Sequence, residues 1–503
     1  MKKEGIKMDL LYRSTRDNMV AVKASEAILK GLSEDGGLFV PEKLPKLNTP
    51  FSVLSGMSYQ EIAFEVMKEF FTDFTSEELK DCISKAYDSK FDTEEIAPLA
   101  KVGSTYYLEL FHGPTIAFKD MALSILPHLM VTSAKKNNIK NNIVILTATS
   151  GDTGKAALAG FSDIPGTKII VFYPKSGVSA VQEKQMVTEK GKNTHVVAIK
   201  GNFDDAQTGV KEIFNNKELI RELDGKGYQF SSANSINIGR LVPQVAYYVY
   251  VYAKLLENKE IEDGEAINLV VPTGNFGNIL AGFYAKEMGV PVNKLICASN
   301  DNKVLYDFFK EGEYNRNREF ILTTSPSMDI LISSNLERLI YSACQADAKK
   351  SLELMNSLKQ DGVYTISEEM KVYMKDFYGY FATETEVAET ISKIFKETNY
   401  LLDTHTAVAA AVSEKYKKEN PEDDTKTVVI STASPYKFVR SVMEAVDSKY
   451  GQMEDFQLID IMKEVSGIEL PKAIEEIRNA EIKHKTVVEV AEMEQAVKSF
   501  LSL

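Results

Sequence analysis

The chain has 503 residues, 44% of them hydrophobic, and a formal net charge of −13. It is longer than one hydrophobic core usually organises, which predicts a soluble globular protein of two or three domains. The acidic balance without a basic cluster argues against nucleic acid and anionic membranes as partners, because both bind concentrated lysine and arginine surfaces.

The N-terminal hundred residues are expected to form a mainly helical extension, residues 1–100. Ser25–Leu32 has a helical composition, and the turn Glu34–Gly37 and the short run Phe39–Pro41 follow it. From about Asn142 the pattern changes to short β-branched runs that alternate with amphipathic segments, which predicts βαβ units around a parallel sheet. The expected strands are 143–147, 168–172 and 196–199, and the expected helices are 155–161, 180–191 and 204–223.

A second alternating series predicts a second α/β lobe. Its expected strands are 267–271, 294–298 and 427–430, with a helix over 278–288. We place a smaller lobe at 101–260 and a larger lobe at 261–503. The charged stretches 257–265 and 415–426 are predicted to be surface connections, and the tail after Met453 is predicted to be helical.

Targeting, thiol and metal signals are weak. No uninterrupted apolar run reaches membrane-spanning length, and Met1–Lys7 lacks the apolar block of a secretory signal, so we expect a cytoplasmic protein with no membrane partner. The three cysteines and five histidines are widely spaced, with no pair at zinc-ligand spacing. Reduced buried thiols and no metal site are therefore expected.

Lys119 lies in the apolar, aromatic segment Phe111–Asp120, just after a Gly-Pro turn. In such surroundings the pKa of a lysine falls, and its neutral amine can form a Schiff base with a carbonyl. A lysine that extends to solvent from a helix start would fit this segment equally well.

Two turns between a predicted strand and a predicted helix carry anion-binding features. In Val271–Asn278, Gly274 and Gly277 allow close approach to an anion at a helix start, although an ordinary turn explains the spacing equally well. In Thr147–Lys155, the hydroxyls and amides suit a carboxylate or a small phosphate ester, or simply cap a helix. A nucleotide P-loop is excluded there, because Thr149 and Ala156 occupy positions that require glycine and Ser or Thr.

A third polar cluster, Ser231–Arg240, groups amides and hydroxyls ahead of an arginine whose planar fork suits two phosphate oxygens. The tyrosines that follow it are more consistent with core packing. Ser431–Pro435 follows a predicted strand, where ligands of α/β proteins bind. Asp403–Val408 is a weaker candidate, because a lone histidine before an alanine-rich helix, here His405, is more consistent with a structural role.

Together these segments, with Ser14–Arg16 and Asp35–Gly37, resemble the threonine synthase family, which has the tryptophan-synthase-β-like fold (PLP fold type II) and uses pyridoxal 5′-phosphate (PLP). The resemblance covers most of the chain, with the motifs in the same order. It implies that Lys119 forms a Schiff base with the cofactor and that Thr432 faces the pyridine nitrogen. The residues implied to hold the cofactor phosphate are Gly274, Asn275, Phe276, Gly277 and Asn278.

The resemblance also implies a substrate, O-phospho-L-homoserine, converted with water to L-threonine and phosphate. The loop implied to hold the substrate carboxylate consists of Ser150, Gly151, Asp152, Thr153 and Gly154. Arg240, with Asn234, Ser235 and Asn237, is implied to hold the leaving phosphate. The alternatives are another lyase of the same fold, such as a serine or threonine dehydratase, and a silent binding protein, which the retained Lys119 disfavours.

Overall fold

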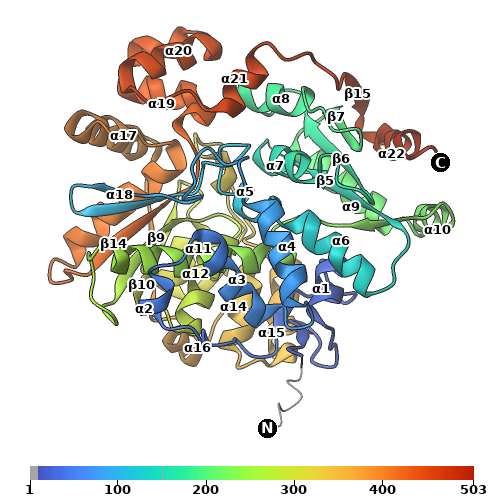
Figure 1. Ribbon diagram of the computed structural model, residues 1–503, viewed down its shortest axis with the longest axis horizontal. Helices are drawn as coiled ribbons and strands as arrows, with labels where there is room; N and C mark the ends of the chain where they lie inside the picture. The colour runs from blue at the N-terminus through green and yellow to red at the C-terminus, as the bar shows by residue number, and fades with distance from the viewer. Residues whose placement is uncertain (1–8, 150) are drawn as a thin grey trace.

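The computed structural model describes residues 9–149 and 151–503 (Figure 1). Two sheets dominate the fold. The larger has the order β13-β10-β9-β14-β4-β3 and is parallel except for β3, which pairs antiparallel with β4. The smaller has the order β15-β7-β6-β5-β8 and is parallel throughout. These two sheets with their helices confirm the predicted α/β class.

The strands of the larger sheet are β3 (Leu99–Val102), β4 (Thr105–Glu109), β9 (Ile267–Pro272), β10 (Val292–Ser299), β13 (Phe377–Phe381) and β14 (Lys426–Ser431). Those of the smaller sheet are β5 (Asn142–Ala148), β6 (Thr167–Pro174), β7 (Thr194–Lys200), β8 (Tyr228–Ser231) and β15 (Thr486–Glu489). Two short antiparallel pairs complete the set: β1 (Tyr12–Ser14) with β2 (Phe39–Pro41), and β11 (Glu313–Asn315) with β12 (Val363–Thr365).

The helices up to the middle of the chain are α1 (Ala24–Lys30), α2 (Phe51–Leu54), α3 (Tyr59–Phe70), α4 (Ser76–Ala86), α5 (Asp120–Leu123), α6 (Leu126–Lys136), α7 (Asp152–Phe161), α8 (Ala180–Val187), α9 (Phe203–Asn215), α10 (Lys217–Gly225), α11 (Ile238–Glu257) and α12 (Gly277–Met288). The later ones are α13 (Val304–Glu311), α14 (Leu336–Ala343), α15 (Ala348–Gln360), α16 (Glu368–Tyr373), α17 (Glu384–Thr398), α18 (Thr404–Glu419), α19 (Val439–Val446), α20 (Asp455–Ser466), α21 (Lys472–Arg478) and α22 (Met493–Leu501). Short 3-10 turns are η1 (Pro326–Met328), η2 (Pro435–Phe438), η3 (Ser448–Gln452) and η4 (Val490–Glu492).

The larger sheet is covered on both faces, which explains its continuous apolar strands. Val428 and Ile430 of β14 face the core formed with α11 and α12, whereas Val429 between them faces the core formed with α18. Alternate residues of a strand point to opposite faces, so one β-branched run fills two cores.

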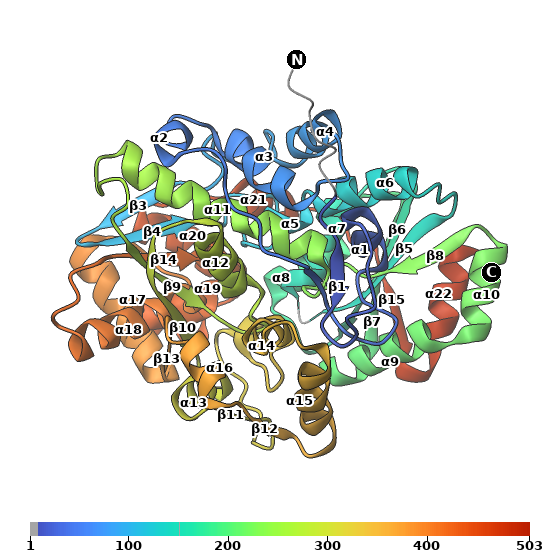
Figure 2. The ribbon, with the colours of Figure 1, turned by 90° about the horizontal axis from the view of Figure 1, so that it is seen from below.

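Helix α11 is the central helix of the fold, packing against both α12 and α3. The N-terminal extension lies along it, with α3 and α4 on the same side of the molecule in Figure 2. Capping boxes at Ser58 and Thr75 start these two helices. As predicted, the tyrosines of α11 are core residues: Tyr247, Tyr248, Tyr250 and Tyr252 are all buried.

Two strands pair with the sheet of the other predicted lobe. The lobe boundaries themselves stay a prediction. Strand β4, expected in the smaller lobe, pairs in parallel with β14 and so belongs to the larger sheet. Strand β15 lies in the tail that was predicted to be helical, yet it pairs with β7 at the edge of the smaller sheet (Figure 1). Its Val487 and Val488 are β-branched, which suits a strand.

Other element boundaries also differ from the sequence prediction. The single helix expected over 204–223 is two helices, because the Asn216 side chain accepts hydrogen bonds from the amides of Glu218 and Leu219 and starts α10. The helix expected up to Gly191 ends at Val187, and α18 continues to Glu419 inside a stretch expected to be a loop.

Within residues 9–149 and 151–503, no helix is both long enough and apolar enough to cross a membrane. In the same residues, no group of histidine, cysteine and acidic side chains could hold a metal ion. Cys82, Cys297 and Cys344 are buried free thiols, as predicted.

Candidate active site

Lys119 lies at the start of α5, where a tight turn fixes the chain. The Asp120 carboxylate accepts hydrogen bonds from the amide and the hydroxyl of Thr115, at 2.8 and 2.6 Å. Gly113 is required in this turn, because a Cβ there would lie 2.6 Å from the Asp120 side chain. The amide of Phe118 donates to the carbonyl of Thr432 at 2.8 Å, so the turn is joined to the carboxyl end of β14.

The Lys119 amine is buried, with only 8% of the residue exposed. Nζ donates to Ser327 Oγ at 3.0 Å and lies 3.3 Å from Asp152 Oδ2. Burial lowers the pKa of Lys119, as the sequence predicted, and the nearby charges of Lys437 and Arg240 lower it further, while Asp152 opposes them. The site therefore makes the neutral form of this amine easier to reach than it is for a lysine in water.

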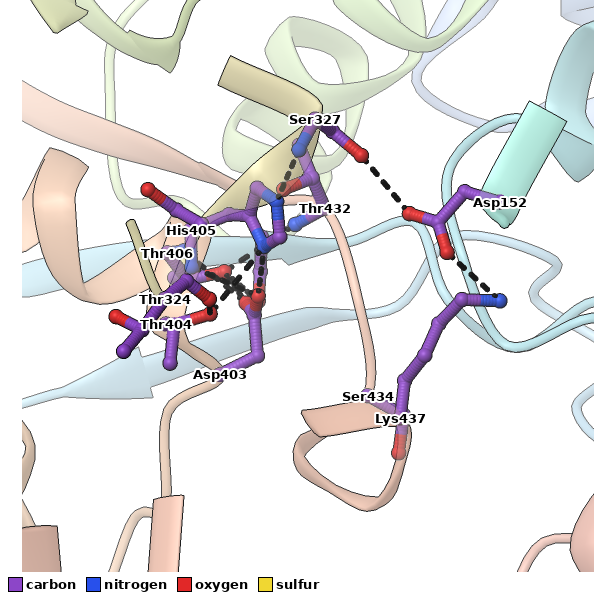
Figure 3. Close-up of polar contacts among 12 residues, drawn as sticks. Asp152, Thr324, Ser327, Asp403, Thr404, His405, Thr406, Thr432, Ser434 and Lys437 are labelled. Carbon is purple, nitrogen blue, oxygen red and sulfur yellow. Dashed lines mark hydrogen bonds and ion pairs between the residues drawn. The ribbon is translucent and has the colours of Figure 1, made fainter. Parts of the chain in front are cut away.

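Asp152, at the start of α7, connects both sides of the site (Figure 3). Oδ2 accepts a hydrogen bond from Ser327 Oγ at 2.9 Å, and Oδ1 accepts one from Gln182 Nε2 at 2.9 Å. Lys437 Nζ lies 3.3 Å from Oδ1. Burial alone would raise the pKa of Asp152, but the positive charge of Lys437 holds that pKa far below its usual range, so Asp152 is ionised.

Ser327 is held in place by a histidine that the sequence suggested was structural. The Ser327 amide donates to His405 Nε2 at 3.3 Å, and His405 Nδ1 lies 2.9 Å from Asp403 Oδ2 (Figure 3). Asp403 in turn caps α18 by accepting from the amides of His405 and Thr406. These bonds are consistent with a proton on Nδ1, which leaves the lone pair of Nε2 to accept from Ser327.

The turn from β9 to α12 has the geometry of an anion cradle. Phe276 precedes the helix in the left-handed conformation, with φ of 65°. Gly274 passes so close to η1 that a Cβ would lie 2.6 Å from the carbonyl oxygen of Ser327. The loop is held by Ser333 Oγ, which donates to the Gly274 carbonyl, and by the Asn335 amide, which donates to the Asn275 carbonyl.

Asn278, in the first turn of α12, carries a free donor. Its Oδ1 accepts hydrogen bonds from the hydroxyls of Tyr247 and Tyr248, at 2.6 and 2.7 Å, which fixes the side-chain amide. Its Nδ2 is buried and has no partner among the described residues. A buried unpaired donor beside helix-start amides fits a phosphate oxygen.

The residues predicted to hold the substrate phosphate divide into two groups. Arg240 is buried and donates to the Ala233 carbonyl at 3.0 Å, but its Nε has no partner among the described residues. Burial lowers its pKa to about 10. Asn234 is exposed, and Ser235 makes one long contact, 3.4 Å, with Asn335 Nδ2. These three retain capacity for a ligand.

Asn237 differs from the prediction. Its Nδ2 donates to the carbonyls of Ile28 and Ser232, and its Oδ1 accepts from the Gly239 amide as the cap of α11. Both amide hydrogens are used, so no donor is left for a phosphate. Asn237 therefore supports the loop that precedes Arg240.

The predicted substrate-carboxylate loop is only partly described, because Ser150 lies outside the described residues. Thr149 Oγ1 accepts from the amides of Gly151 and Gly154, both at 2.9 Å, which shapes the loop. Gly154 is a packing position, since a Cβ there would lie 2.4 Å from the Thr149 side chain. Asp152 and Thr153 begin α7, with Asp152 turned toward Lys119.

Thr432 follows β14 and is buried. Its amide donates to Thr406 Oγ1 at 3.2 Å. The carboxyl ends of β9 and β14, which are neighbours in the sheet, thus bring residues 273–278 and 432 to one edge, as expected for a ligand site.

Three family models match the chain. "Threonine synthase N terminus" matches residues 11–87, "Pyridoxal-phosphate dependent enzyme" matches 94–433, and "Threonine synthase, C-terminal" matches 406–501. The threonine synthase of Saccharomyces cerevisiae is 35% identical over 504 residues, which are 94% of this chain and 96% of that protein. The chain belongs to the threonine synthase family.

The structure of a PLP-bound threonine synthase from Brucella melitensis agrees with this assignment. Its TM-score is 0.87 at 35% identity, and the match covers 98% of this chain and 100% of that chain. Human threonine synthase-like 1 is 40% identical over 392 residues, and the match covers 75% of this chain. The chain spans about half of the length of that relative, 52%. The predicted family, fold type and PLP dependence are confirmed.

Sequence reasoning did not assign Ser327 or Lys437 to the site, and it gave Asp403 only within the weaker candidate segment Asp403–Val408. Lys437 stands in the run Ser434–Phe438, which belongs to the family resemblance but has no ligand-binding pattern of its own. Ser327 lies in the short 3-10 turn η1, where a single serine gives no signal. The three reach the site through the fold.

Proposed function

We propose that this protein is a threonine synthase that converts O-phospho-L-homoserine and water into L-threonine and phosphate. The observation that carries the proposal is a buried arginine on a helix that packs against the helix of the buried Lys119. Arg240 lies in α11, which packs against α5, the helix that Lys119 precedes, and its Nε is a buried donor without a partner among the described residues. A guanidinium so placed suits a phosphorylated substrate.

Lys119, Thr432 and the turn 274–278 are the residues that would hold PLP. The amides of Gly277 and Asn278 and the free Asn278 Nδ2 would bind its phosphate. The Thr432 hydroxyl would face the ring nitrogen, to which a hydroxyl cannot transfer a full proton as an aspartate could. When bound, PLP withdraws electrons from the α carbon of the substrate.

Lys119 Nζ is the base that would take the α proton. It is suited to this role because burial, together with the charges of Lys437 and Arg240, lowers its pKa and so makes the neutral amine easier to form. Lys119 Nζ donates to Ser327 Oγ at 3.0 Å. This hydrogen bond fixes the position of the amine next to Asp152. The loop over Gly151, Asp152, Thr153 and Gly154, with Ser150, would hold the substrate carboxylate.

Arg240, with Asn234 and Ser235, would hold the phosphate of the substrate and then the departing phosphate ion. A charged donor stabilises the charge that develops on the leaving group. Asn237 is left out of this set because its donors are occupied. A cytoplasmic location stays a prediction.

Incubation of the purified holoenzyme with O-phospho-L-homoserine, followed by phosphate assay and amino-acid analysis, tests this function. We expect threonine and phosphate in equal amounts. Phosphate with 2-oxobutyrate as the only organic product would instead indicate a dehydratase-like lyase. An unchanged substrate with a bound cofactor would favour a silent binding protein.

A further inference from the structure

The site holds a second buried lysine to which the proposed chemistry assigns no role. Lys437, on η2, has a fully buried side chain, with 0% exposed. Its Nζ donates to the Thr115 carbonyl at 2.9 Å and to Gln185 Oε1 at 3.5 Å, and lies 3.3 Å from Asp152 Oδ1. A lysine is almost never fully buried without a specific charge partner.

Asp152 is therefore shared between two lysines, one at each carboxylate oxygen. Lys119 Nζ lies 3.3 Å from Oδ2, and Lys437 Nζ lies 3.3 Å from Oδ1. A carboxylate paired with Lys119 alone would stabilise the protonated form of that amine. This would oppose the neutral form that both attachment to an aldehyde and proton abstraction require.

We propose that Lys437 is a positioning residue, whose charge balances the Asp152 carboxylate and so leaves the Lys119 amine free of its extra proton. This inference rests on the proposed function, because it concerns the amine that attaches to PLP. Lys437 approaches Asp152 Oδ1 and Lys119 approaches Oδ2, so Lys437 acts on Lys119 through the shared carboxylate and through its own repulsion of a second positive charge.

The surrounding charges support this role. Three charged side chains change the pKa of Lys119: Asp152 on α7 raises it, whereas Lys437 on η2 and Arg240 on α11 lower it. His405 on α18 reaches the same group of residues through Ser327, whose amide donates to its Nε2. The Asp120 carboxylate, next to Lys119 in the sequence, accepts hydrogen bonds from Thr115; burial raises the pKa of Asp120, and the charge of Lys437 opposes that rise. Lys437 is the cation whose charge acts most strongly on Asp152.

The test measures how fast PLP attaches covalently to Lys119, using full-length protein from which the cofactor has been removed. The rate is followed from about pH 6 to about pH 10, because attachment needs the neutral amine of a lysine. The variants are Lys437→Met, Asp152→Asn and the double variant, and peptide mapping identifies the modified lysine. Lys136→Met removes a lysine from an ion pair with Glu78 outside the site and is the matched control.

Lys437→Met is expected to raise the pH midpoint of PLP attachment by about one unit. At neutral pH the neutral fraction of Lys119 would then be about tenfold smaller, and attachment about tenfold slower. Asp152→Asn is expected to lower the midpoint, and the double variant to return it close to that of the unmodified chain. Lys136→Met is expected to leave it unchanged. If Lys437→Met does not fold, the comparison of Asp152→Asn with the double variant decides the same question.

An unchanged midpoint in folded Lys437→Met, or a double variant that does not shift relative to Asp152→Asn, overturns the inference. Attachment to a residue other than Lys119 in the unmodified chain overturns the proposed function, and this inference with it. The two failures are distinguishable, because the first keeps the modification on Lys119 and the second does not.

Discussion

Ser327 Oγ accepts a hydrogen bond from Lys119 Nζ at 3.0 Å, although the two residues are 208 positions apart in the sequence. The same oxygen donates to Asp152 Oδ2 at 2.9 Å, so one hydroxyl joins the amine to the carboxylate. The Ser327 amide is fixed by His405. The lysine is thus oriented by residues from both halves of the chain.

Ser327→Ala removes the hydroxyl between Lys119 and Asp152. Hydrogen bonds to charged groups contribute about 1.5–3 kcal/mol, so we expect kcat to fall about ten- to hundredfold. Steady-state kinetics with O-phospho-L-homoserine measures this. Ser84→Ala, at an exposed serine whose hydroxyl donates to the Asp81 carbonyl at 3.1 Å, is the control. A kcat equal to that of the control would show that the hydroxyl does not orient the amine.

Gly274→Ala would place a Cβ 2.6 Å from the Ser327 carbonyl oxygen, which forces the cradle or η1 to move. We expect PLP affinity to fall about tenfold or more, because the loss of about 1.4 kcal/mol is one factor of ten. Equilibrium binding of PLP followed by absorbance measures it. Gly225→Ala meets open space and is the matched control. Equal affinities in the two variants would place the cradle elsewhere.

Arg240 and Asn237 are expected to respond differently to substitution, because only Arg240 retains a free donor. Arg240→Gln should lower kcat/KM about a hundredfold, as for the loss of a charged partner worth about 2–3 kcal/mol. Asn237→Ala removes the cap of α11 and should cost about 1–2 kcal/mol of unfolding free energy. Denaturant titration together with kinetics separates the two effects. A stable Asn237→Ala protein with a hundredfold lower kcat/KM would reverse these roles.

His112 makes folding stability depend on pH. Burial opposes its charge, but hydrogen bonds and charges from Asp92 and Glu109 raise its pKa from 6.5 to about 9. Because the folded pKa is raised, its stabilisation is complete below about pH 6.5 and is lost as pH rises through about 9. The unfolding free energy of the natural chain minus that of His112→Gln should fall by about 1–3 kcal/mol over this window. Denaturant titrations of both proteins at several pH values measure it, and a difference independent of pH would contradict the assignment.

The sequence predicts most of the fold because buried parallel strands are short, continuous β-branched runs. Strands β5, β6, β7, β9, β10 and β14 all lie where these runs were expected. Strand β15 was missed because four residues in a polar tail give a weak pattern until β7 offers an edge for pairing. The break between α9 and α10 was missed because Asn216 acts as a cap only in its folded geometry.

The site was predictable where one motif carries its own chemistry. Lys119 and the turn 274–278 combine residue type with local geometry, so they stand out in the sequence. Lys437, Ser327 and His405 gain their roles from distant partners, since Lys437 lies 3.3 Å from Asp152 only after the lobes assemble. Asn237 was predicted to bind the substrate phosphate because its amide suits an anion. In the folded chain its Nδ2 donates instead to the carbonyls of Ile28 and Ser232.

The attachment of PLP to Lys119 is tested most directly by reducing the holoenzyme with borohydride and mapping the peptide that carries PLP. Lys119 and Lys437 are both buried at Asp152, so the experiment distinguishes two amines in the same site. We expect the modification on Lys119, and we expect both the modification and the yellow absorbance band to be lost completely in Lys119→Ala. Modification of Lys437, or of any residue other than Lys119, would contradict this expectation.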